Sequence, residues 1–143
     1  MTARTKTREK KARWYSGADV PMRVIRKFAR EVAEQFQPDK IFLFGSHAYG
    51  TPHADSDVDI LVVMPASNEM SKASRIRLAV PRPFAMDLIV RTPEDLHRRL
   101  EEGDWFLREI VERGKVLYEK PDAGLGAKGR ARPANGATRR RRP

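Results

Sequence analysis

A glycine–serine pair is the first feature of this sequence whose residue types suggest chemistry. Gly45 and Ser46 directly follow the apolar run 41–44, which we expect to be a strand, and they are expected to open a helical turn. Glycine allows a ligand to approach the backbone closely, and a serine hydroxyl beside free N–H groups can hold phosphate oxygens. The pair therefore predicts a phosphate-binding turn, although a simple helix-capping turn would use the same residues.

Two aspartates follow, two residues apart, at the start of the apolar run 58–64. Side chains on a strand alternate between its faces, so the carboxylates of Asp57 and Asp59 are predicted to lie on the same face. Two like charges this close repel unless a cation lies between them, and Mg²⁺ prefers oxygen ligands of this kind. The spacing predicts a divalent metal site, with a solvated strand end as the alternative. Asp55, just before them, is interpreted as a turn residue.

The third candidate is Asp87, which is the one polar residue of the apolar run 84–90. A carboxylate within such a strand is costly unless it is paired, neutralised or bound to a metal. An ion pair with Arg82 or Arg91 is one explanation. If the run instead lies beside the strand at 58–64, Asp87 joins the two other carboxylates in a cluster of three. Such a cluster, facing a phosphate-binding turn, suits two-metal transfer of a phosphate-containing group.

The elements that must position these residues alternate between helices and strands. Apolar residues at spacings of three and four predict a helix over 20–37, with Asp19 as its N-cap. Further strands are expected at 41–44, 58–64, 84–90 and 116–118, and further helices at 92–100 and 105–112, whereas 66–79 is ambiguous with a possible short helix from Ser71. Strands that are apolar on both faces indicate a sheet covered by helices. The predicted fold class is therefore α/β (α+β), with a small mixed sheet flanked by helices.

The charge of the chain lies at its two ends. The 143 residues carry a net charge of +10, which alone would suggest a nucleic-acid binder. Residues 1–13 carry +5 and residues 121–143 carry +6, which leaves −1 for 14–120. Both ends are poor in large apolar side chains, a composition typical of disorder. We expect a basic disordered arm over 1–17, one domain over 18–120, and a disordered tail over 121–143 that could contact nucleic acid weakly.

Several classes of protein are excluded by composition. The chain has no cysteine, so disulfide scaffolds, cysteine-ligated zinc, iron–sulfur clusters and thiol nucleophiles fall away. His47, His53 and His97 lack the spacing of a zinc site. No apolar run approaches the roughly 18 residues of a membrane span, and the N-terminal residues do not form a secretory signal. We therefore expect a cytoplasmic protein without a membrane contact.

The residues above also resemble a known family. The segment GSHAYGTPHADSDVDILVV is similar to the signature of the nucleotidyltransferase superfamily with the DNA-polymerase-β-like fold, and MDLIV to the strand that carries its third aspartate. Over about residues 20–119 the chain resembles the minimal nucleotidyltransferases, so the resemblance implies the polymerase-β-like fold. Relatives often carry Arg in the loop after Gly-Ser, where this chain has His47 and Tyr49. Arg82 or Arg91 could replace that charge.

The resemblance also implies a role for each candidate residue. Gly45 and Ser46 would hold the β,γ-phosphates of a nucleoside triphosphate. Asp57 and Asp59 would coordinate two Mg²⁺ ions. Asp87 would bind the second ion and help to deprotonate the acceptor hydroxyl, which then attacks the α-phosphate and releases pyrophosphate.

A function follows from this resemblance. It implies a Mg²⁺-dependent enzyme that transfers a nucleoside monophosphate, AMP from ATP, to a hydroxyl. Minimal members are commonly encoded beside a HEPN-domain protein, which implies an antitoxin that adenylylates a tyrosine of a partner toxin. A chain this short leaves little room for an acceptor-binding domain, which favours a partner that brings the acceptor. The alternatives are an enzyme acting on a small molecule such as an aminoglycoside, and a non-catalytic module whose basic tails bind nucleic acid or a partner.

Overall fold

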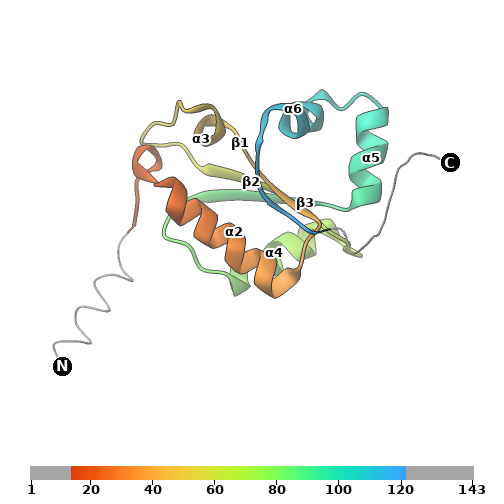
Figure 1. Cartoon of the computed structure of the whole chain (residues 1–143), viewed down its shortest axis with the longest axis horizontal. Coiled ribbons are helices and arrows are strands. Elements are labelled where there is room, and N and C mark those ends of the chain that lie inside the picture. The colour runs from red at the N-terminus through yellow and green to blue at the C-terminus, as the bar shows by residue number, and fades with distance from the viewer. Residues whose placement is uncertain (1–13, 122–143) are drawn as a thin grey trace.

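The computed structural model describes residues 14–121, so the predictions made for 1–13 and 122–143 lie outside the described residues. The elements follow one another as η1 (Gly17–Asp19), α2 (Met22–Phe36), β1 (Lys40–Phe44), α3 (Ser46–Tyr49), β2 (Val58–Val63), α4 (Glu69–Ala79), β3 (Met86–Arg91), α5 (Pro93–Glu101), α6 (Trp105–Arg113) and β4 (Lys115–Glu119) (Figure 1). Between residues 14 and 121, no helix is long and apolar enough to cross a membrane.

The four strands form one mixed sheet in the order β3-β2-β1-β4. β1 pairs antiparallel with both β2 and β4, whereas β2 and β3 pair in parallel. The parallel pair is joined through α4, as a parallel connection requires a crossover. This architecture confirms the predicted small mixed sheet flanked by helices, and it places the second and third predicted strands side by side.

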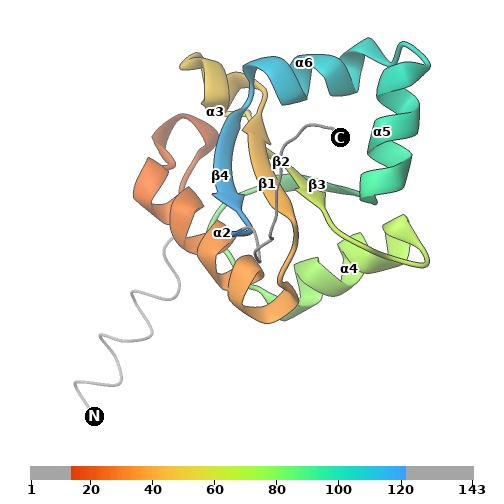
Figure 2. The same ribbon diagram turned by 45° about the vertical axis from the view of Figure 1, so that its right-hand side comes forward.

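Helices α2 and α4 cover one face of the sheet (Figure 2). The apolar stripe of α2, formed by Ile25, Phe28, Ala29 and Val32, is buried there. The ring of Phe28 meets that of Phe84 edge-on, with 6.0 Å between the ring centroids. Gln37 ends the helix in the left-handed conformation with a φ of 52°, and Pro38 follows it. This face holds the larger of the two apolar cores.

Helices α5 and α6 lie over the opposite face, where a smaller core forms (Figure 1). Its buried members are Phe42, Leu61, Val63, Leu107 and Ile110. Both helices have a capping side chain, because Thr92 Oγ1 accepts from Asp95 N and Asp104 Oδ1 accepts from Leu107 N. The predicted helix start at residue 92 is therefore confirmed.

Two predicted helix starts differ from the structure. Asp19 is not the N-cap of α2, since that position is Pro21; Asp19 lies in η1 and accepts a hydrogen bond from Ser16 Oγ at 3.0 Å. The ambiguous stretch 66–79 forms α4 from Glu69 rather than from Ser71. Asn68 caps this helix, with its Oδ1 accepting from Ser71 N at 2.9 Å.

The predicted arm over 1–17 overlaps the described residues at 14–17, and part of that overlap is packed against the domain. Tyr15 N donates to Pro83 O at 2.9 Å, and Gly17 N donates to Ala54 O at 3.0 Å. Gly17 is buried. Residues 15–17 are therefore part of the folded domain, because their backbone groups are paired with two distant loops.

Candidate active site

The three aspartates singled out from the sequence come together at one end of the β2–β3 pair. Asp59 is the second residue of β2, and its register partner in β3 is Asp87. Asp57 lies just before β2, and its charge acts on Asp59. The parallel pairing thus brings into one neighbourhood two carboxylates that are 28 residues apart along the chain.

These carboxylates lie on the sheet face that α5 and α6 cover. Leu61 and Ile89, each two residues after an aspartate, both belong to the core on that face, and the alternation of side chains puts Asp59 and Asp87 on the same side. Phe44 is the partner of Asp59 in β1 and contacts Phe106 of α6 edge-on, with 5.7 Å between centroids. Asp57 and Asp87 are exposed and Asp59 is partly exposed, so solvent reaches all three carboxylates.

Gly45 lies directly against the carboxylate of Asp59. It has a φ of +76°, and a Cβ atom built on it would be 2.1 Å from Asp59 Oδ2. Any other residue at this position would displace the carboxylate. The sequence predicts that a ligand approaches this glycine closely, and in the structure an aspartate of the protein lies against it.

Ser46 begins the short helix α3 next to that glycine. Its carbonyl accepts from Thr51 N at 3.0 Å, which folds the chain back toward the loop that leads to β2. Within the described residues its hydroxyl makes no hydrogen bond, so this donor and acceptor is available to a ligand. The predicted helical turn after Gly45 is confirmed.

The charge of Asp59 is disfavoured by its surroundings. Burial, and after it the charges of Asp87 and Asp57, raises the pKa of Asp59 from 3.8 to about 6, while His47 acts in the opposite direction. The like charges of the two neighbouring carboxylates thus add to the effect of burial.

The donor set fits a hard divalent cation in its chemistry, since the neighbourhood offers three carboxylates and an unfavourable negative charge. Between residues 14 and 121, however, no three His, Asp or Glu side chains are gathered closely enough to hold a metal ion as they stand. The aspartates are thus neighbours in the sheet rather than a preformed set of ligands.

The alternative ion pairs of Asp87 are absent within the described residues. Arg82 Nη1 donates to the carbonyl oxygens of Arg77 and Val80, and Arg91 pairs with Glu69. Asp87 also lies near the beginning of β3, which starts at Met86 rather than at residue 84, and it is exposed rather than buried. The premise that this carboxylate lies in an apolar interior is therefore wrong.

One residue of the site was not found from the sequence. His47 is buried, its Nε2 donates to Gly17 O at 2.7 Å, and its Nδ1 has no hydrogen-bond partner among the described residues. It also favours the ionised form of Asp59. The sequence offered no signal for this contact, because the partner is a backbone carbonyl 30 residues away. His53, in contrast, is exposed and accepts a hydrogen bond from Asp55 N.

The model of the nucleotidyltransferase domain family matches residues 25–118, which include all five candidate residues. This chain belongs to the nucleotidyltransferase domain family. The nucleotidyltransferase is therefore a transferase that moves nucleotidyl groups, and members of this family generally use a nucleoside triphosphate and a divalent metal.

Two individual proteins are similar to this nucleotidyltransferase. One is described as "Putative protein adenylyltransferase MJ0604" of Methanocaldococcus jannaschii; it is 28% identical over 99 residues, which cover 67% of this chain and 96% of that protein. The other is the solved structure of a "putative nucleotidyltransferase" from Sulfolobus solfataricus, with 21% identity and a TM-score of 0.41, covering 53% of this chain and 70% of that chain.

Proposed function

We propose that this nucleotidyltransferase transfers AMP from ATP to a hydroxyl of a partner protein, in a Mg²⁺-dependent reaction. The observation that carries the proposal is the register of β2 and β3, which pairs Asp59 with Asp87 beside Gly45. An arrangement of carboxylates next to a turn with a free serine hydroxyl suits phosphoryl chemistry, in which positioning and charge neutralisation supply most of the catalysis.

In this proposal Asp57, Asp59 and Asp87 hold two Mg²⁺ ions, which when bound would neutralise charge on the phosphates. The hydroxyl of Ser46 and the backbone at Gly45 bind the β,γ-phosphates. Asp87 takes the proton of the acceptor hydroxyl, since it is exposed on the open side of the site. The acceptor oxygen forms a bond to the α-phosphorus while the bond to the bridging oxygen breaks, and pyrophosphate leaves.

The acceptor is proposed to be a tyrosine of a HEPN-type toxin, with this nucleotidyltransferase as its antitoxin. The name of the Methanocaldococcus relative, a protein adenylyltransferase, supports a protein acceptor. The exposed carboxylate of Asp87 also supports a large acceptor, because a macromolecular side chain can reach it without entering an enclosed cavity.

The test is one incubation of the purified protein with Mg²⁺, ATP labelled at the α-phosphate, and the product of the neighbouring gene. We expect label on that product. The variants Asp57→Asn and Asp59→Asn should reduce the labelling by about 100-fold or more, because each removes charge from the site.

The control is Asp55→Asn, which removes an exposed carboxylate from the same loop and should leave labelling within about twofold of the wild type. Labelling that persists in the Asp57 and Asp59 variants would overturn the assignment of the site. If a small-molecule hydroxyl is labelled and the protein is not, the acceptor class is wrong and the transferase activity stands.

A further inference from the structure

The backbone of residues 15–17 contacts each of the three segments that carry the candidate site. Tyr15 N donates to Pro83 O, in the loop that leads to β3 and Asp87. Gly17 N donates to Ala54 O, three residues before Asp57. Gly17 O accepts from Nε2 of His47, the residue that follows Ser46. These three hydrogen bonds measure 2.9, 3.0 and 2.7 Å respectively.

The contact at Gly17 is close as well as hydrogen-bonded. A Cβ atom built on this glycine would lie 2.3 Å from Ser56 O and 2.5 Å from His53 O. The loop that it contacts is itself fixed, since His53 N donates to Ser56 Oγ and Ser56 N donates to His53 O, both at 2.9 Å. A shift of residues 15–17 would therefore move this loop, which leads directly into Asp57.

His47 is the side chain that completes this arrangement. It is 9% exposed, and its hydrogen bond to Gly17 O is buried. A buried carbonyl that loses its donor costs more than an exposed one, so the contact is hard to replace by water. His47 is also fixed by α3, whose first residue is Ser46.

We infer that residues 15–17 and His47 form a clamp that positions the phosphate-binding turn, the Asp57 loop and the Asp87 strand relative to one another. The expected effect of the clamp on AMP transfer rests on the proposed function, whereas the clamp itself rests on the three hydrogen bonds described above. The clamp residues Tyr15 and Gly17 lie ahead of residues 25–118, the part that matches the family. His47 acts here as a positioning residue and touches no reacting atom.

The clamp can be tested with a pair of variants at His47 in the full chain. His47→Leu removes the donor to Gly17 O, whereas His47→Gln offers an amide N–H near the position of Nε2. Hydrogen exchange of the Gly17 amide, measured on the protein alone, should become about tenfold faster in the Leu variant and return toward the wild-type rate in the Gln variant.

The functional arm measures the Mg²⁺ concentration that gives half-maximal AMP transfer. We expect this value to rise by about tenfold or more in His47→Leu and by about twofold or less in His47→Gln, because residues that orient metal ligands typically contribute in this range. Ile25→Val is the control for a general loss of stability, since Ile25 is fully buried in α2 and takes part in none of the three hydrogen bonds. It should lower the melting temperature without changing the Mg²⁺ requirement.

The outcomes separate the clamp from the proposed function. Unchanged exchange at Gly17 in His47→Leu would overturn the clamp, and so would faster exchange with an unaltered Mg²⁺ requirement. A wild-type protein that transfers no nucleotide would overturn the proposed function, while its Gly17 exchange would still report on the hydrogen bonds.

Discussion

The carboxylate of Asp59 occupies the space that a side chain on Gly45 would fill. A Cβ atom at Gly45 would lie 2.1 Å from Asp59 Oδ2, and the positive φ of this residue adds strain for any L side chain. The glycine that follows β1 and the second residue of β2 thus lie against each other. This pair joins the proposed phosphate-binding turn to the proposed metal ligands.

Gly45→Ala should therefore reduce AMP transfer by about 100-fold or more, because the new methyl group must push the Asp59 carboxylate aside. It should also lower the free energy of unfolding by about 1 kcal/mol through the positive φ. Transfer of label and urea denaturation measure the two effects separately.

Gly50→Ala is the matched control for that prediction. Gly50 has a φ of +81°, close to that of Gly45, but a Cβ atom built on it meets nothing within 4 Å. The control should lose similar stability and keep its activity. Equal losses of activity in the two variants would show that backbone strain, rather than the contact with Asp59, is responsible.

Asn68 caps a helix in the structure, whereas Asp19, the predicted cap of α2, does not. Asn68→Ala removes the side chain that accepts from Ser71 N and should lower the free energy of unfolding by about 1 kcal/mol. Asp19→Ala removes the cap that the sequence predicted for α2, and it should change the stability by less than about 0.5 kcal/mol because Asp19 caps nothing there. Chemical denaturation of both variants measures the difference, and the reverse order of effects would contradict it.

Much of the fold could be predicted from local patterns. The helix α2 follows from an apolar stripe with a spacing of three and four, and the strands follow from short runs that are apolar on both faces. The start of α4 does not follow from an apolar pattern, because only Ala73 and Ile76 of this helix are buried. A helix that buries two residues has almost no periodic pattern, so its cap at Asn68 was the better signal.

Local sequence patterns also predict part of the candidate site. The spacing of Asp57 and Asp59 and the single polar residue in a strand identified the residues, and a parallel pairing of the strands was enough to bring Asp87 to them. His47 and Gly17 could not be predicted. Their contact joins a side chain to a distant backbone carbonyl, and no local periodicity records such a pair.

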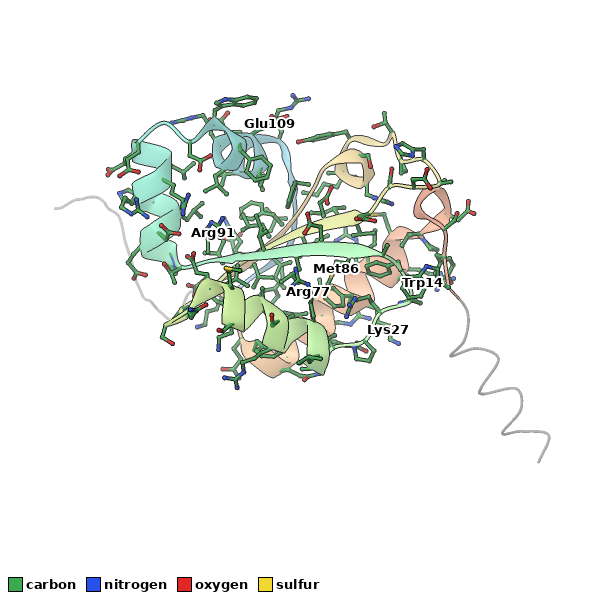
Figure 3. All side chains as sticks on the ribbon, turned by 180° about the vertical axis from the view of Figure 1, so that it is seen from behind. Trp14, Lys27, Arg77, Met86, Arg91 and Glu109 are labelled. Carbon is green, nitrogen blue, oxygen red and sulfur yellow. The ribbon has the colours of Figure 1, made fainter. Side chains whose placement is uncertain are left out.

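Arg77 should protect the exposed edge of the sheet from pairing with another chain. β3 is an edge strand, and Arg77 Nη2 donates to its Leu88 O at 2.8 Å (Figure 3). Arg77→Met leaves that carbonyl to solvent or to another chain, since unpaired edge groups are templates for strand pairing. We expect a loss of about 1 kcal/mol of stability and a higher apparent mass by light scattering.

Arg75→Met is the control for the edge, because Arg75 is an exposed residue of the same helix and makes no hydrogen bond or ion pair within the described residues. It should leave both the stability and the mass unchanged. If Arg75→Met and Arg77→Met associate equally, the loss of charge is the cause and the capping of β3 is not.

Because the pKa of Asp59 is raised in the folded protein, the stability of the protein should fall as the pH rises through that range. In the folded protein its pKa is about 6, mainly through burial and then through Asp87 and Asp57, against 3.8 for the ordinary group. Between these two values the folded state holds a proton that the unfolded state has lost, so this carboxylate lowers the stability as the pH rises from about 4 to about 6. Above pH 6 the full penalty is present.

Asp59→Asn should therefore be more stable than the wild type at pH 7.5 when Mg²⁺ is absent, by about 1 kcal/mol. This figure is discounted for the solvent that reaches the half-buried carboxylate. The gain should vanish toward pH 4. If the carboxylates bind Mg²⁺, a saturating concentration of about 10 mM should stabilise the wild type and so reduce the gain at pH 7.5. Thermal melts at both pH values, with and without Mg²⁺, measure this. A gain that is the same at pH 4 and pH 7.5 would mean that neither burial nor the neighbouring carboxylates disfavour the charge of Asp59.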